Sequence, residues 1–211
     1  MLRLLIVGCP HSGTRFIAQM LTRAGLPCGH EQVFALDGVK PATRIAESSW
    51  VATHYLGLNA IPSETVVVHQ TRDPIAWLNS WVRTTTADAA WRFLEIMYPG
   101  IGAERARDPV RTAMRLWVRM NRRCESSSLR TFRIEAVDHE FGSGITHQLG
   151  ELAGVTLGPD RIADALAATD LDRNHHPGES GHVPLAWGSL PAGPDRDEFA
   201  GLARAYGYDG L

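Results

Sequence analysis

The sequence contains a single lysine, Lys40, and its 21 Lys and Arg residues nearly balance 23 Asp and Glu residues. The formal net charge of −2 gives no sign of general nucleic-acid binding, so any phosphate recognition must be local. No apolar run approaches the roughly 20 residues that a membrane helix needs. Because the chain opens directly on an apolar strand, we expect no signal peptide and a cytoplasmic protein.

Cysteine is also scarce. Cys9, Cys28 and Cys124 are odd in number and match no metal-ligand or redox spacing. We therefore expect reduced thiols and no metal site. A chain of 211 residues is long enough for one well-buried domain and short for two, so we predict a single domain over residues 1–211.

The most informative stretch is residues 4–17, which read LLIVGCPHSGTRFI. The pattern predicts a buried strand, a tight loop and the first turn of a helix. Backbone N–H groups converge at such a junction, and the helix dipole favours an anion there. A P-loop nucleoside triphosphatase would need the motif G-x-x-x-x-G-K-[ST], but no lysine lies near this loop. The loop therefore predicts a phosphate-binding site of another kind.

A second apolar strand, over residues 65–70, ends in a polar turn that carries Arg72. Asp73 is expected to cap the following helix, and Pro74 suits the first helical position. The Arg72 guanidinium can bind two phosphate oxygens at once, while Ser80, two helical turns further on, offers a hydroxyl donor. Arg72 and Ser80 are thus candidates for binding a second phosphate.

These two segments resemble the phosphate-binding motifs of sulfotransferases that use 3′-phosphoadenylyl sulfate (PAPS). The Pro-x-Ser-Gly-Thr loop is similar to the family's 5′-phosphosulfate loop. Arg72 and Ser80 keep the spacing of the family's 3′-phosphate motif. Weaker matches over residues 132–135 and 174–190 fall in the expected order. The resemblance covers nearly the whole chain and implies a bacterial, cytosolic enzyme with a P-loop-like sulfotransferase fold.

Strands alternate with helices along the chain, which favours an α/β fold with three αβα layers and a mostly parallel central sheet. Ligands of such sheets bind at the carboxyl ends of the strands. Strands are predicted over residues 2–8, 26–28, 65–70 and 130–135. Helices are predicted over residues 13–24, 49–56, 74–84, 87–98, 108–124, 144–153, 159–167 and 196–205.

The resemblance implies in-line transfer of a sulfuryl group from PAPS to a hydroxyl of a small metabolite, carbohydrate or lipid, with no metal required. By analogy with phosphoryl transfer, positioning and electrostatics do most of the work. Arg72 and Ser80 would hold the 3′-phosphate. The implied 5′-phosphosulfate residues are Pro10, His11, Ser12, Gly13, Thr14 and Arg15.

Two neighbouring residues are candidates for the general base. Residues 28–31 resemble the G-x-E segment of tyrosylprotein sulfotransferases, in which the Glu is the base, and this makes Glu31 the first candidate. A carboxylate works best as a base if burial raises its pKa above the ordinary value of roughly 4.3. His30 is the alternative, because histidine is the commonest general base.

The loop departs from the family pattern at His11, where members usually carry Lys or Arg. That cation normally meets the leaving-group oxygen. A protonated His11 could supply the charge, and so could Arg15. The sequence leaves both open.

Residues 170–197 are rich in Gly, Pro and His and are expected to form a long loop that acts as a lid, anchored by Trp187. Its histidines, His175, His176 and His182, lack further partners for a metal site. The segment of Ser48, Ser49 and Trp50 resembles the helix start that lines the acceptor side in related bacterial sequences, and core packing is an equal alternative for Trp50. No pattern in the chain specifies the acceptor or an oligomeric state.

Two other functions stay open. A P-loop small-molecule kinase would share the fold, but it needs an acidic Mg²⁺ ligand at a strand end, where residues 69–72 read HQTR. A protein that binds PAPS or its bisphosphate product but has lost transfer activity through His11 is the other alternative.

Overall fold

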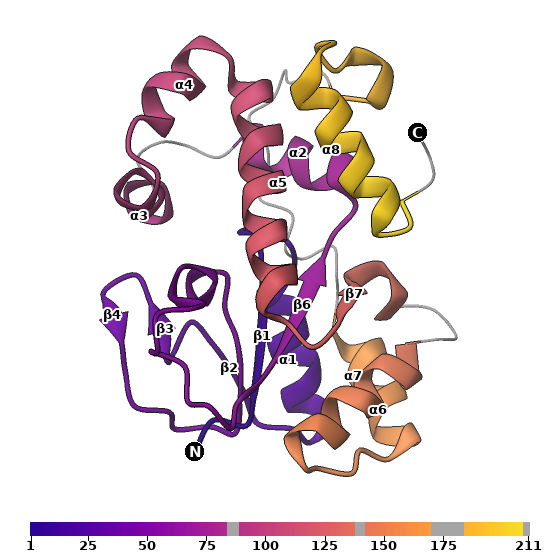
Figure 1. Ribbon diagram of the computed structural model, residues 1–211. Helices are drawn as coiled ribbons and strands as arrows, with labels where there is room; N and C mark the ends of the chain where they lie inside the picture. Colours follow the sequence, from indigo (N-terminus) through magenta and orange to yellow (C-terminus); the bar gives the residue numbers. More distant parts are fainter. Residues whose placement is uncertain (84–88, 138–141, 170–183, 209–211) are drawn as a thin grey trace. The chain divides into compact units, whose positions relative to one another are not determined.

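A computed structural model describes residues 1–83, 89–137, 142–169 and 184–208 (Figure 1). The chain divides into two compact units. The first comprises residues 1–72 and 121–174, and the second comprises residues 73–120 and 175–211. That all 211 residues form one sulfotransferase-like domain stays a prediction.

The first unit is built on a five-stranded sheet whose order is β2-β5-β1-β6-β7. Every neighbouring pair in it is parallel. The strands are β1 (Leu4–Gly8), β2 (Cys28–His30), β5 (Ala46–Ser48), β6 (Val66–Thr71) and β7 (Thr131–Arg133). Their carboxyl ends therefore meet at one edge of the sheet, which is the edge where the sequence analysis predicts ligand binding.

Strand β1 is buried along its whole length because both faces of the sheet are covered. Its side chains alternate between two cores. Leu4 and Ile6 pack against one helical layer, and Leu5 and Val7 pack on the opposite side. This alternation follows from the two-residue period of a strand.

The first helical layer consists of α1 (Thr14–Ala24), α6 (Gly142–Ala153) and α7 (Pro159–Ala168), with α7 and α6 lying beside α1 in Figure 1. The opposite face is covered by the short helix η1 (Val51–Tyr55), the hairpin of β3 (Phe34–Ala35) and β4 (Gly38–Val39), and Cys124 from the last turns of α5 (Pro109–Ser127). The expectation of an αβα fold with a mostly parallel sheet is confirmed.

Helix α1 begins and ends where the sequence indicates. Its apolar residues, including Phe16, Ile17 and Leu21, repeat at the helical period and are buried. Gly25 ends the helix in a left-handed conformation with φ 105°, and its N–H reaches the carbonyls of Leu21 and Thr22. This helix therefore presents its N-terminus at the carboxyl edge of β1.

The second unit is helical. It holds α2 (Pro74–Val82), α3 (Ala89–Met97), α4 (Ile101–Arg107), the part of α5 before Asn121, the short η4 (Trp187–Ser189) and α8 (Pro194–Ala205). Asp73 caps α2 as expected, because its Oδ1 accepts the N–H of Ala76 at 2.7 Å. Trp77 and Trp81 stack in the core of this unit, with ring centroids 5.6 Å apart.

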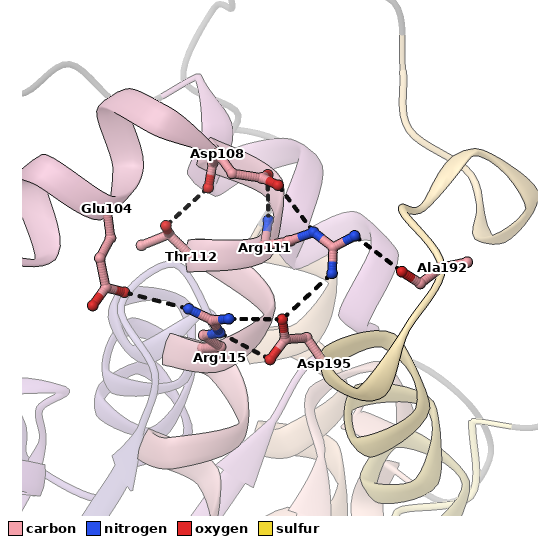
Figure 2. A network of polar contacts seen from close by, with 7 residues as sticks. All are labelled: Glu104, Asp108, Arg111, Thr112, Arg115, Ala192 and Asp195. Atoms are coloured by element: carbon pink, nitrogen blue, oxygen red, sulfur yellow. Dashed lines mark hydrogen bonds and ion pairs between the residues drawn. The ribbon is translucent and has the colours of Figure 1, made fainter.

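A charged network joins α5 to α8 within the second unit (Figure 2). Arg115 donates two hydrogen bonds to the carboxylate of Asp195, at 2.8 and 3.0 Å. Arg111 binds Asp108 through Nε at 3.0 Å and donates to the carbonyl of Ala192 at 2.9 Å. The two arginines thus fix the start of α8, and they hold the pKa of Asp195 below its ordinary value.

Several element predictions are wrong in detail. The helix expected over residues 49–56 is only the five-residue η1, and the strand expected over residues 130–135 gives way after Arg133 to a short 3-10 helix. Helix α4, strand β5 and the β3–β4 hairpin were not predicted. The loop expected up to residue 197 ends earlier, at the start of α8. Its residues 170–183 lie outside the described residues.

Within the described ranges, no helix is both long enough and apolar enough to cross a lipid bilayer.

Candidate functional site

The predicted phosphate loop joins β1 to α1 at the carboxyl edge of the sheet. His11 lies in the left-handed region with φ 64°, and Gly13 does so with φ 90°. The Ser12 N–H donates to the Cys9 carbonyl at 3.1 Å, and Ile17 donates back to Gly13 at 3.1 Å. The amides of Thr14, Arg15 and Phe16 therefore precede the first helical hydrogen bond of α1, in the arrangement that binds anions.

Two side chains from the end of β6 bind consecutive carbonyls of this loop. Arg72 donates from Nη1 to the carbonyl of His11 at 2.9 Å. Gln70, which is fully buried, donates from Nε2 to the carbonyl of Ser12 at 2.5 Å. The carbonyls are thereby held toward β6, and the loop is fixed to the strand that carries the second phosphate motif.

Gly8, at the end of β1, and Gly13, in the loop, are closely surrounded by their neighbours. A Cβ atom at Gly8 would lie 2.6 Å from the Gln70 carbonyl oxygen and 2.7 Å from Ser12 Oγ. At Gly13, it would lie 3.2 Å from the side chain of Ile134. Ser12 Oγ is itself buried and has no hydrogen-bond partner among the described residues. A buried hydroxyl that lacks a partner in the described part of the chain, beside the N-terminal amides of a helix, fits a loop that binds an anion.

A buried polar network contacts the start of the loop through Cys9. His69 Nε2 lies 2.9 Å from Asn121 Oδ1, and His69 Nδ1 lies 3.1 Å from the hydroxyl of Thr131. Asn121 donates from Nδ2 to Cys9 Sγ at 3.2 Å. Because Oδ1 only accepts, the proton of the imidazole lies on Nε2. Burial lowers the pKa of His69 to about 4, so the ring is neutral near pH 7.

Both candidate bases lie beside the loop. His30 Nε2 lies 3.2 Å from Thr14 Oγ1 and 3.4 Å from Glu31 Oε1. Burial, with a contribution from the positive charge of Arg15, lowers the pKa of His30 to about 4. His30 is therefore neutral near pH 7, and its contact with Glu31 is not an ion pair there. A neutral imidazole and a carboxylate thus stand together at the edge of the loop.

A buried carboxylate that the sequence analysis missed holds the turn after β2. Glu31 lies in the left-handed region with φ 54°. Immediately after it, the N–H groups of Gln32 and Val33 donate to Glu47 Oε1, at 2.6 and 2.9 Å. Glu47 lies in β5 beside Gly29 and is fully buried. The sequence analysis missed Glu47 because strand β5 is only three residues long and has no apolar pattern that predicts a strand.

The first unit brings together most of the predicted site residues. Pro10 and Ser12 are buried in the loop, Arg15 is exposed on the first turn of α1, and Arg72 contacts His11. Ser80 lies half-buried in α2, which belongs to the second unit. Its pairing with Arg72 stays a prediction.

The segment expected on the acceptor side is packed into the protein. Ser48 and Ser49 are fully buried, and Trp50 is 6 % exposed. Ser49 Oγ donates to the carbonyl of Phe34 at 3.0 Å, which ties the start of η1 to the hairpin. Trp187 is half-buried in the second unit, with its ring 5.4 Å from that of Phe199. The role expected for this segment on the acceptor side stays a prediction.

The three cysteines are buried thiols. Burial raises the pKa of Cys9, and of Cys124 to about 12, which keeps both thiols protonated. Over the described ranges, no group of three or more His, Cys, Asp or Glu side chains is arranged to hold a metal ion. His175, His176 and His182 lie outside the described residues.

No protein-family model matches this chain, and a search of curated proteins found no match either.

Proposed function

We propose that the protein is a sulfotransferase that transfers a sulfuryl group from PAPS to a hydroxyl of a small metabolite, carbohydrate or lipid. The observation that carries this proposal is the hydrogen bond from Arg72 to the His11 carbonyl, at 2.9 Å. It brings the residue of the 3′-phosphate motif against the loop of the 5′-phosphosulfate motif. Two anion-binding elements at one edge fit a nucleotide with two separate phosphates.

The loop supplies the binding site for the 5′-phosphosulfate. The amides of Thr14 and Arg15 stand at the N-terminus of α1, where the helix dipole favours negative charge. Ser12 Oγ, buried without a partner among the described residues, adds a hydroxyl that can rotate toward a ligand. These groups stabilise the charge that develops on the leaving oxygen when the sulfuryl group departs.

Arg72 supplies the charge for the 3′-phosphate. Its guanidinium has five N–H groups, so it can bind a phosphate while it holds the His11 carbonyl. Ser80 adds a hydroxyl by the spacing of the motif. An arginine is suited to this task because its planar donors match two phosphate oxygens at once.

Glu31 and His30 are the groups that would take the proton of the acceptor. In the transfer, the acceptor oxygen forms a bond to sulfur, the bond from sulfur to the phosphate oxygen breaks, and the hydroxyl proton passes to the base. His30 is neutral near pH 7 and can accept a proton at Nε2. The contact of 3.4 Å between His30 and Glu31 would allow the carboxylate to stabilise the resulting imidazolium.

The test is release of 3′,5′-adenosine bisphosphate from PAPS in the presence of a panel of hydroxyl acceptors. Glu31→Gln and His30→Gln each isolate one candidate base, and Glu64→Gln on an exposed turn is the matched control. We expect turnover to fall in one of the first two variants while bisphosphate affinity is kept. Bisphosphate binding without release in any acceptor mixture would favour the binding-protein alternative, and binding of Mg-ATP alone would favour the kinase.

A further inference from the structure

The turn that carries both candidate bases has an unfavourable backbone. Glu31 is in the left-handed region with φ 54°, which a residue with a side chain adopts rarely. Such conformations persist where the surrounding structure holds them, and they cluster at functional sites. The groups that stabilise this turn therefore influence the orientation of the His30 and Glu31 side chains.

Glu47 is the group that holds it. Its Oε1 accepts the N–H groups of Gln32 and Val33, the two residues that follow Glu31, at 2.6 and 2.9 Å. Since the amides of both residues point at a single oxygen, the chain is bent just after Glu31.

The carboxylate has room only because residue 29 is glycine. Gly29 and Glu47 are partners in the parallel register of β2 and β5. A Cβ atom at Gly29 would lie 2.0 Å from Glu47 Oε2 and 3.2 Å from Glu47 Cδ. Glu47 Oε2 is buried and has no hydrogen-bond partner among the described residues. Keeping such an oxygen buried is costly, and this favours a role beyond packing.

We propose that Glu47 is a positioning residue that fixes His30 and Glu31 against the phosphate loop. The inference rests on the proposed sulfotransferase function. Glu47 is fully buried and cannot touch an acceptor, so it acts through the turn. The conformation of this turn then determines the contacts of His30 Nε2 with Thr14 Oγ1, at 3.2 Å, and with Glu31 Oε1, at 3.4 Å.

Two variants test this by different routes. Glu47→Gln keeps the shape of the side chain but replaces its carboxyl group with an amide. Gly29→Ala leaves Glu47 unaltered and displaces its carboxylate by contact. The control is Glu64→Gln, the same change at an exposed position of the same unit. All three proteins are compared with the wild type in amide hydrogen exchange, in calorimetric titration with 3′,5′-adenosine bisphosphate and in turnover with PAPS.

In Glu47→Gln and Gly29→Ala, we expect faster amide exchange at Gln32 and Val33, and an NMR-measured pKa of His30 that rises from about 4 toward 6.5. We expect kcat to fall between about tenfold and a hundredfold, the effect of a small misplacement of a reacting group. Bisphosphate affinity should stay near that of the wild type, since Arg72 and the loop are unchanged.

An unaltered His30 titration in both variants, or a kcat equal to that of Glu64→Gln, would overturn the proposal. A fall in bisphosphate affinity equal to the fall in kcat would also overturn it, because that result indicates general loosening of the unit. If the two variants show the expected His30 response but the wild-type protein does not turn over PAPS, the proposed function is refuted and Glu47 remains the residue that positions the turn.

Discussion

Arg72 donates a hydrogen bond from Nη1 to the carbonyl of His11, at 2.9 Å, and so joins the end of β6 to the loop that follows β1. The two residues are far apart in the sequence but come from strands that pair in parallel, with Gly8 opposite Gln70. The bond uses the backbone of His11, so it does not depend on the side chain that departs from the family pattern. A residue of one predicted phosphate site thus contacts the backbone of the other predicted phosphate site.

Gln70 should contribute to the stability of the loop. Gln70→Leu removes the donor to the Ser12 carbonyl, a bond of 2.5 Å in the core. Leaving that carbonyl buried without a donor should lower the free energy of unfolding by about 1–3 kcal/mol. Urea denaturation measures the change, and Gln19→Leu on the exposed face of α1 is the control. Equal stabilities of the two variants would contradict the account.

Gly8 and Gly201 should respond to alanine in opposite directions. At Gly8, the added Cβ would lie 2.6 Å from the Gln70 carbonyl oxygen, and we expect a loss of about 1–3 kcal/mol. At Gly201, in α8, nothing lies within 4 Å, so alanine should stabilise the helix by about 0.5–1 kcal/mol. Thermal unfolding of both variants decides the point, and a stable Gly8→Ala protein would show that the loop packs less closely.

The histidines whose pKa values are lowered should make stability fall on mild acidification. The pKa values of His30, His54 and His69 are lowered by burial to about 4 from 6.5. Between these values the unfolded chain binds protons that the folded chain does not, so the free energy of unfolding decreases as pH falls. Each histidine contributes at most about 1.4 kcal/mol per pH unit.

Denaturation at pH 6 and pH 5 measures this slope, and His69→Gln should reduce it by about a third. Glu47 acts in the opposite direction, because burial raises its pKa above 4.5, and its effect is greatest at the lower end of the range. A stability that stays level between pH 6 and pH 5 would contradict the burial of these imidazoles.

Arg15 should influence the neighbouring candidate base, His30. Its positive charge is one of the two causes that lower the pKa of His30, the larger being burial. In Arg15→Gln, an NMR titration should therefore show a His30 pKa somewhat above about 4. If Arg15 also supplies the loop cation that His11 lacks, turnover with PAPS should fall in this variant. An unchanged turnover would exclude Arg15 as that cation.

The elements that the sequence predicts well are those with long apolar patterns. β1 and α1 have them, and their ends are marked by Gly8 and Gly25. Short elements carry no such signal. Strand β5 has three residues, and the β3–β4 hairpin has two in each strand, so their pairing depends on tertiary contacts.

The candidate site was only partly predictable for a similar reason. Glu31 and Arg72 were predicted because they follow strands in patterns that resemble a family, and His30 was predicted because it stands beside Glu31 and histidine is the commonest general base. Gln70 and Glu47 were missed, since a polar residue within a strand has no distinctive spacing and its role depends on which backbone groups it meets. In the folded protein, the loop supplies the Ser12 carbonyl to Gln70, and the turn after β2 supplies its backbone N–H groups to Glu47.

The most direct test of the central claim is calorimetric titration of the purified protein with 3′,5′-adenosine bisphosphate, beside ATP with Mg²⁺. Arg72→Ala is the test variant, and Arg130→Ala, an exposed arginine of the same unit, is the control. We predict tight bisphosphate binding that is lost in Arg72→Ala and kept in Arg130→Ala. Binding of Mg-ATP alone, or bisphosphate binding that Arg72→Ala leaves intact, would contradict the account.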